Sequence, residues 1–339
     1  MNERSKRMTL GWGAGLALVC LAPCPALAAA QPKAALAEYF GLCSASAGVA
    51  VDANRFLVAS DEDSVLRLYR VDKADAPEQV YDLTGFLELD GKSTETDIEA
   101  ATRLGDRAFW ITSHGRNAKG KRRESRARFF ATKLSLAGEK VLVEPEGRPY
   151  RQLLADLLSA PDLARYNLSA ASKLAPEEGG LNIEGLCSAP QGHLWIGFRS
   201  PLAQQRALLV PLLNPAGVTI GERAQLGKPR ELDLGGLGIR DLGLADGQYL
   251  IVGGPAASKG KTRLFLWDGG QGAPRRFDHA RLKGLHPECV IFYPGTGLRE
   301  AQVLSDDGGR NIDGCPCSEL TDPALRRFRS VWIRAQLGE

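Results

Sequence analysis

Two nearly identical cassettes, 85 residues apart, constrain the fold of this chain more than any other feature. The first cassette is DIEA at residues 97–100 and leads to Trp110, and the second is NIEG at residues 182–185 and leads to Trp195. In both, the tryptophan follows the glutamate by 11 residues, and weaker copies begin at Gly238 and His286. A supersecondary unit repeated in this way is typical of a solenoid or a propeller.

Short apolar or alternating segments, broken by Gly, Pro, Asp and Asn, recur along the chain as in sequential antiparallel strands. They form four sets of four strands and a last set of three, at 48–83, 98–143, 183–234, 239–277 and 289–334. The incomplete last set predicts that residues 39–42 supply its missing strand and close a ring. We therefore expect an all-β fold, a β-propeller of five blades.

One segment, residues 149–173, departs from the strand pattern. Its leucines lie at helical spacing, at positions 153, 154, 157, 158 and 163. We expect a helical insertion between the second and third blades, although a degenerate sixth blade inside it is an open alternative. An α/β fold is excluded because helices do not alternate with the strands.

Residues 1–28 have the pattern of a secretory signal peptide. A basic start with Arg4 and Arg7 precedes an apolar stretch at 10–21 and the small-residue cleavage site Ala26-Leu27-Ala28. The apolar stretch is shorter than the roughly 20 residues of a membrane span. The sequence thus predicts a periplasmic or secreted protein without a membrane span, whose residues 29–339 form a single propeller domain.

Charge and cysteine content add few constraints. A net charge of +3 with scattered basic residues gives no reason to expect nucleic acid as a partner. The mature chain has an odd number of cysteines, so at least one is unpaired. They are Cys43, Cys187, Cys289, Cys315 and Cys317. Their pairing and the oligomeric state stay open.

The repeated polar positions predict one rim of the ring. The start of a blade's first strand lies beside the end of its antiparallel second strand, so both ends reach the same mouth of the central channel. The acids that start the strands are Glu99, Glu184, Asp241 and Glu288. The polar residues that end the neighbouring strands are Asp61, His114, Arg199 and Asp306.

Such a rim has two interpretations. Carboxylate oxygens are the ligands that Ca²⁺ takes, six to eight at a time, so Glu99, Glu184, Asp241 and Glu288 are candidate metal ligands for Ca²⁺. Alternatively, each acid accepts hydrogen bonds from the backbone of the next blade and joins the ring. The sequence leaves both open.

A basic loop follows His114 and contains Arg116, Asn117 and a KRR triplet at residues 121–123. Guanidinium groups bind phosphate and carboxylate groups bidentately. We expect Arg116 and Asn117, with Arg199 and Arg240, to bind an anionic small molecule at the mouth, with His114 as the catalytic proton shuttle. A solvated loop without a ligand is the alternative.

Several of these segments together resemble an uncharacterised bacterial family, domain-of-unknown-function family 3616. The segments are SDED at 60–63, DIEAA at 97–101, WITSHGRN at 110–117, NIEGL at 182–186 and GIRDL at 238–242. The family has no established activity. A looser resemblance, through the repeated Glu-Gly strand starts, is to esterase-like phytase propellers and implies action on phosphate esters.

Two functions follow as hypotheses. The first is an exported metal-dependent hydrolase of an anionic phosphate ester or lactone at the channel mouth. The second is a non-catalytic propeller that binds a ligand or a protein there. The fold does not decide between them, because propellers host both kinds of function.

Overall fold

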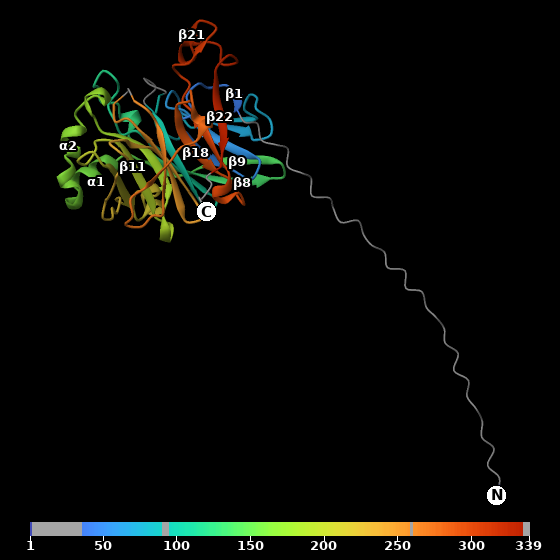
Figure 1. Cartoon of the computed structure of the whole chain (residues 1–339), viewed down its shortest axis with the longest axis horizontal. Helices are drawn as coiled ribbons and strands as arrows, with labels where there is room; N and C mark the ends of the chain where they lie inside the picture. The colour runs from blue at the N-terminus through green and yellow to red at the C-terminus, as the bar shows by residue number, and fades with distance from the viewer. Residues whose placement is uncertain (2–35, 90–94, 258–259, 335–339) are drawn as a thin grey trace. The chain divides into compact units, whose positions relative to one another are not determined.

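The computed structural model describes residue 1 and residues 36–89, 95–257 and 260–334 (Figure 1). Residues Lys33–Glu339 form one compact unit. Apart from Met1, the predicted signal peptide at 1–28 lies outside the described residues. Among the helices of the described ranges, none combines the length and the apolar character that a membrane crossing requires.

Five four-stranded antiparallel sheets form the blades, as the sequence predicted. The first blade contains β2 (Ala47–Ala50), β3 (Arg55–Ala59), β4 (Val65–Arg70) and β5 (Gln79–Asp82). The second contains β6 (Ile98–Leu104), β7 (Arg107–Thr112), β8 (Phe129–Ala137) and β9 (Lys140–Tyr150). The third contains β10 (Asn182–Ser188), β11 (Leu194–Ser200), β12 (Ala207–Leu212) and β13 (Arg230–Leu232). The fourth contains β14 (Gly238–Ala245), β15 (Gln248–Gly254), β16 (Arg263–Trp267) and β17 (Arg275–Phe277).

The fifth blade combines both ends of the described chain. Its strand order is β18 (Pro287–Phe292), β19 (Ala301–Ser305), β22 (Arg327–Ile333) and β1 (Leu36–Phe40). β1 pairs antiparallel with β22 from Leu36 opposite Val331 to Phe40 opposite Arg327. The predicted closing strand therefore exists, three residues earlier at its start than expected. The fold is a five-bladed β-propeller.

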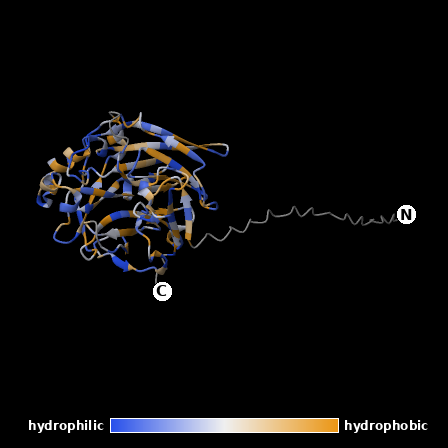
Figure 2. Ribbon diagram, turned by 90° about the horizontal axis from the view of Figure 1, so that it is seen from above, coloured by the Kyte–Doolittle hydropathy of each residue, from blue (hydrophilic) through white to orange (hydrophobic). Residues whose placement is uncertain are grey.

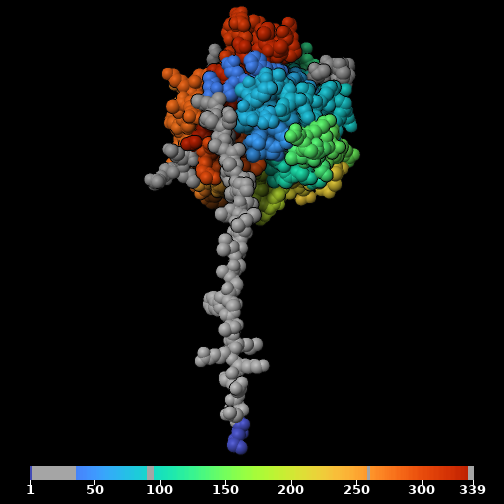
Figure 3. All heavy atoms as spheres, turned by 90° about the vertical axis from the view of Figure 1, so that its right-hand side faces the viewer, coloured from blue at the N-terminus to red at the C-terminus, as the bar shows by residue number. Residues whose placement is uncertain are grey.

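A disulfide and a short hairpin lie beside this closure. Cys43, just after β1, is bonded to Cys317, whereas Cys187, Cys289 and Cys315 are free thiols. Cys317 follows the two-stranded hairpin of β20 (Asn311–Ile312) and β21 (Cys315–Pro316), which the strand pattern did not predict. Figure 3 shows this C-terminal segment, in red, projecting from the body of the blades.

The core consists of apolar clusters between neighbouring blades. In Figure 2 hydrophobic stretches are coloured orange along the ribbon. Trp110 packs between the first two blades and donates its indole N–H to Thr132 Oγ1 at 3.0 Å. Trp195 packs between the third and fourth and donates to the Tyr249 hydroxyl at 3.2 Å. Both tryptophans therefore hold blades together, and their buried N–H groups are satisfied.

The predicted helical insertion lies between β9 and β10 (Figure 1, green). It contains α1 (Leu153–Ser159), the 3₁₀ helix η2 (Pro161–Tyr166) and α2 (Leu168–Ala171). Leu153 and Leu157, four residues apart on one face of α1, are buried in the core between the second and third blades. Leu154 is partly buried and Leu158 is 37 % exposed. The insertion therefore turns one leucine row inward and leaves a second row facing outward.

Candidate functional site at the channel mouth

In four of the five blades a β-bulge places one side chain at the mouth. In β6, β10, β14 and β18 the register with the second strand shifts by one residue near the strand start. The unpaired extra residues are Glu99, Glu184, Arg240 and Glu288. A bulge re-aims the side chain of its extra residue, so the same position recurs in the second to fifth blades, whereas the first blade has no bulge between β2 and β3. In the fourth blade the repeated position is Arg240, and Asp241 is one residue further along.

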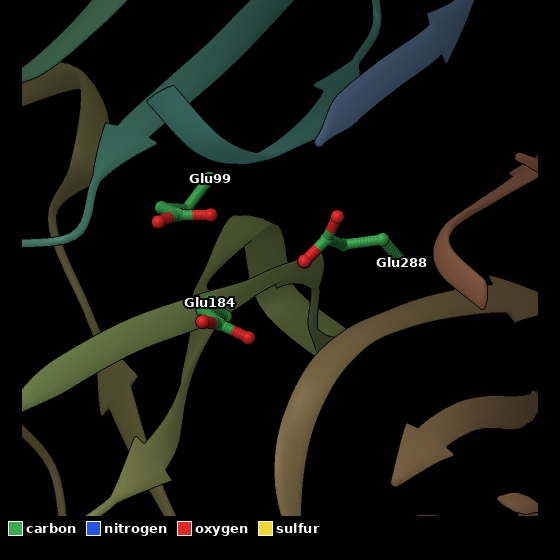
Figure 4. Close-up of side chains that lie close together, drawn as sticks. All are labelled: Glu99, Glu184 and Glu288. Carbon is green, nitrogen blue, oxygen red and sulfur yellow. The ribbon is translucent and has the colours of Figure 1, made fainter. Parts of the chain in front are cut away.

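The three bulged glutamates converge. Each of Glu99, Glu184 and Glu288 offers a carboxylate oxygen within 4.8 Å of the other two (Figure 4). The side chains come from three blades and are buried, with exposures of 8 %, 1 % and 4 %. Burying carboxylates together is unfavourable unless cations or hydrogen bonds compensate. The cluster therefore needs positive charge.

Two arginines supply part of that charge. Arg199, at the end of β11, donates from Nη1 to Glu184 Oε1 at 2.7 Å. Arg240 lies between two glutamates, with Nε 3.4 Å from Glu184 Oε2 and Nη2 paired with Glu288 Oε1. A Cβ at Gly254 would lie 2.5 Å from Arg240 Cδ, so glycine there leaves room for the arginine. Both predicted anion-binding arginines are thus occupied by the glutamates.

Glu99 differs from the other two. Asn182 Nδ2 donates to Glu184 at 2.7 Å, in addition to the two arginines. Within the described ranges, Glu99 has neither an ion pair nor a hydrogen-bond donor. Burial and the nearby carboxylates of Asp97 and Glu184 hold the pKa of Glu99 well above its ordinary value, and Arg240 opposes this rise. The cluster is therefore only partly compensated.

Further acids surround the cluster. Burial, together with the charges of Asp306 and Asp97, raises the pKa of Asp61 to about 8. Burial also raises the pKa of Asp97 to about 6, although Arg126 Nη1 lies 2.9 Å from Asp97 Oδ2 and opposes the rise. Burial is the main cause of both shifts, and the neighbouring carboxylates add to them because negative charges depress one another's ionisation. Arg126, the last residue of the 3₁₀ helix η1 (Glu124–Arg126), also pairs with Glu95 and so neutralises part of this charge.

The structure places Asp241 away from the three glutamates. Its Oδ2 accepts a hydrogen bond of 2.7 Å from the backbone N–H of Val290 in the next blade. Burial holds the pKa of Asp241 well above its ordinary value. Of the four acids predicted as metal ligands, three therefore come together, and Asp241 makes the blade-to-blade contact of the alternative interpretation.

His114 is not part of the glutamate cluster. By register, Ser113 corresponds to Asp61, Arg199 and Asp306, and His114 follows by one residue. Its Nδ1 lies 2.8 Å from the Thr112 carbonyl, and burial lowers its pKa to about 4. Its Nε2 is buried without a hydrogen-bond partner in the described structure. The imidazole is therefore neutral, with Nδ1 protonated because a carbonyl only accepts.

The basic loop packs against the helical insertion. Arg116 donates from Nε to the Ser172 carbonyl at 2.9 Å and from Nη1 to Gly120 at 3.0 Å. Asn117 Oδ1 accepts from the backbone N–H groups of Lys119 and Lys121 and so shapes its own loop. Neither residue has a hydrogen bond or ion pair to Glu99, Glu184 or Glu288 among the described residues.

Comparison with solved structures returns propeller enzymes of low sequence identity. Glutaminyl cyclase of Myxococcus xanthus is 15% identical, with a TM-score of 0.47, and the match covers 87% of this chain and 94% of that one. A putative oxidoreductase (glucose dehydrogenase) of Thermus thermophilus is 12% identical, with a TM-score of 0.42 and coverages of 88% and 99%. Virginiamycin B lyase of Staphylococcus aureus is 10% identical, with a TM-score of 0.36 and coverages of 89% and 89%. No curated protein sequence matches the chain.

A family model matches the middle of the chain. The match runs over residues 141–290, which include the second full cassette at 182–185 and the weaker copies at 238–241 and 286–289. These copies carry the bulged residues of three blades. The predicted resemblance is confirmed: residues 141–290 match the family described as "Protein of unknown function (DUF3616)".

Proposed function

We propose that the three bulged glutamates hold a hard divalent cation, Ca²⁺ in particular, and that the protein is an exported metal-dependent hydrolase of an anionic phosphate ester or lactone. The observation that carries the cation site is the convergence of Glu99, Glu184 and Glu288 within 4.8 Å. Carboxylate oxygens from three blades suit Ca²⁺, which accepts irregular oxygen geometry. The cluster contains no imidazole or thiolate, so softer metals are disfavoured.

Glu99, which has no donor or ion-pair partner among the described residues, supports this proposal most directly. A buried carboxylate without a donor is costly, whereas Glu184 and Glu288 have arginine partners. A cation beside Glu99 would remove that cost and would also neutralise its repulsion from Glu184. The remaining acids, Asp61 and Asp97, would strengthen the negative potential at the mouth.

Hydrolysis at this site would use the groups already described. A bound cation would polarise the substrate and lower the pKa of a bound water molecule. Arg199 and Arg240, which pair with Glu184 and Glu288 in this structure, would be released to orient the anionic group of the substrate once a cation binds those carboxylates. Proton transfer by His114 stays a prediction, since His114 is not part of the glutamate cluster. The resemblance to phytase-like propellers motivates the phosphate ester as the first substrate class to test.

Export is the second part of the proposal. The signal-peptide pattern supports it, as does the disulfide, because disulfides persist in oxidising compartments such as the periplasm. A non-catalytic propeller that binds an anionic ligand or a protein at the same mouth is the alternative. It is favoured by the pairing of Arg199 and Arg240 with Glu184 and Glu288, which stabilises part of the ring without a cation.

Ca²⁺ is expected to raise the melting temperature of the chelator-treated protein in a concentration-dependent way, because it binds only the native state. Glu99→Gln, which removes the unpaired carboxylate and leaves both arginine pairs, should weaken Ca²⁺ binding at least tenfold, about 1.4 kcal/mol. Asp241→Asn is the matched control and should leave the affinity unchanged. Thermal scans across a Ca²⁺ titration measure both. A melting temperature independent of Ca²⁺ up to millimolar concentration contradicts the cation site.

Arg240→Gln is expected to change the Ca²⁺ affinity in the opposite direction. The arginine competes with a cation for Glu184 and Glu288, so its removal should tighten Ca²⁺ binding several-fold while lowering the stability of the metal-free protein. Calorimetric titration of the chelator-treated variant measures the change. If affinity falls instead, Arg240 supports the bound state and the competition argument is wrong.

Hydrolysis of phosphomonoesters and lactones, assayed with and without chelator, separates enzyme from binding module. The hydrolase proposal expects turnover that is lost with chelator, is restored by Ca²⁺ and is impaired in Glu99→Gln. Ca²⁺ binding without turnover in either substrate class favours the non-catalytic alternative.

A further inference from the structure

A cavity of about 560 Å³ lies between the basic loop and the helical insertion. One wall is formed by residues 114–116 and by residues of the loop that ends before β8, and the other by α1, α2 and Lys173. Its volume is within the range of small-molecule sites, about 300–1,000 Å³. It shares no lining residue with the glutamate cluster.

The cavity carries an excess of positive charge. Its cationic lining residues are Arg116, Arg122, Arg123, Arg151 and Lys173, against the single acid Glu124. Glu124 pairs with Arg122, and Arg151 pairs with Glu88 outside the cavity. Arg123 and Lys173 are exposed, and within the described part of the chain neither has an ion-pair partner. Two cations from opposite walls are therefore available to an anion.

His114 adds a hydrogen-bond acceptor to this basic site. His114 is 4 % exposed and is one of the residues that line the cavity, and its Nδ1 donates to the Thr112 carbonyl. Nε2 then carries a lone pair, and no donor among the described residues reaches it. A buried acceptor without a donor is destabilising. Because Nε2 is itself buried, a ligand hydroxyl reaches it only after the cavity wall at His114 shifts. Such a donor would satisfy Nε2, whereas a bare oxyanion would not.

The outward-facing leucine row completes the lining. Leu154, Ala155 and Leu158 belong to the cavity wall formed by α1. Apolar carbon next to cations is the usual composition of a pocket that binds a polar molecule through its skeleton and a few directed groups. The insertion thus exposes apolar area where it faces the basic loop.

We propose that this cavity binds a small soluble polyol or sugar phosphate. The phosphate lies between Arg123 and Lys173, a hydroxyl donates to His114 Nε2, and the carbon chain packs against Leu154 and Leu158. The site is separate from the cation site, and the proposal does not depend on the proposed hydrolase function.

Calorimetric titration of the chelator-treated full-length mature protein tests it with two probes, glycerol 3-phosphate and propyl phosphate, which differ in the hydroxyl groups. Glycerol 3-phosphate should bind about tenfold more tightly. R123A/K173A should weaken both probes tenfold or more. K119A/K121A, with the same change of charge in the same loop but outside the cavity lining, should leave both unchanged. H114F should abolish the preference for glycerol 3-phosphate and retain propyl phosphate binding.

Equal affinity of the two probes for the unmodified protein, or unchanged affinity in R123A/K173A, overturns the proposal. These two results remain decisive even where H114F does not fold. Binding to phosphatidylglycerol vesicles without binding to free glycerol 3-phosphate also overturns it, since the partner would then be a membrane surface. Because chelator is present throughout, failure of the cation site does not affect the result.

Discussion

Replacing Cys43 and Cys317 together by alanine is expected to lower the free energy of unfolding by about 4 kcal/mol. The bond joins residues 274 positions apart, so it closes nearly the whole described chain into one loop. Cross-links that close long loops restrict the unfolded chain most. The bond also joins the segment after β1 to the segment before β22. The strands β1 and β22 themselves pair with each other in the last blade. Urea unfolding followed by tryptophan fluorescence measures the loss.

The double variant is needed because a single substitution leaves a thiol that could pair with Cys315 nearby in the sequence. Cys315→Ala, which removes a partly exposed free thiol, is the matched control and should change stability by less than about 0.5 kcal/mol. A double variant as stable as the unmodified protein would show that strand pairing alone closes the ring.

Stability is expected to fall by about 3 kcal/mol more in the unmodified protein than in His114→Phe when the pH is lowered from 7.5 to 4. Burial lowers the pKa of His114 from 6.5 to about 4 in the folded state. Between these values the unfolded chain binds the proton and the folded chain does not, so acid favours unfolding. The contribution is fully present above pH 6.5 and is lost as the pH falls towards 4.

Urea unfolding of both proteins at several pH values measures the difference, and the titrations of other groups largely cancel in the comparison. Asp61, whose pKa is raised, contributes a slope of opposite sign to both proteins. His193→Gln, at a half-buried position before β11, is the control. A parallel pH dependence of His114→Phe and the unmodified protein would show that the imidazole is not buried in its neutral form.

The blades were predictable from sequence because each strand carries its own alternation of apolar residues and its own turn residues. The mouth was predictable for Glu99, Glu184 and Glu288, which occupy the third position of their cassettes. In the fourth blade we predicted Asp241 at the mouth because it is acidic, whereas the bulge places Arg240 at that position. A bulge is a property of two paired strands, so the one-residue shift is visible only when the register with β15 is known.

Other features depended on contacts between distant segments. The pairing of Cys43 with Cys317 follows from ring closure and not from their spacing in sequence. The basic loop was expected above the mouth, but Arg116 contacts the helical insertion, whose position no local pattern defines. Likewise, His114 was assigned to the same position in its blade as Asp61 because both follow a serine. The strand register instead makes Ser113 the equivalent of Asp61 and places His114 one residue further along.

The shared last blade also has a consequence for how the chain reaches its native state. Of the strands, β1 is synthesised first and its partner β22 last. The pairing that completes the final blade therefore cannot form until nearly the entire chain has been made. Before that pairing forms, Cys43 can form a disulfide with Cys187 or Cys289, both of which are buried free thiols in the folded protein. The correct covalent pairing is therefore available only after the blades have assembled. An oxidant that acts too early would trap the nascent chain in a non-native cross-link, and thiol exchange would then determine the yield of native protein.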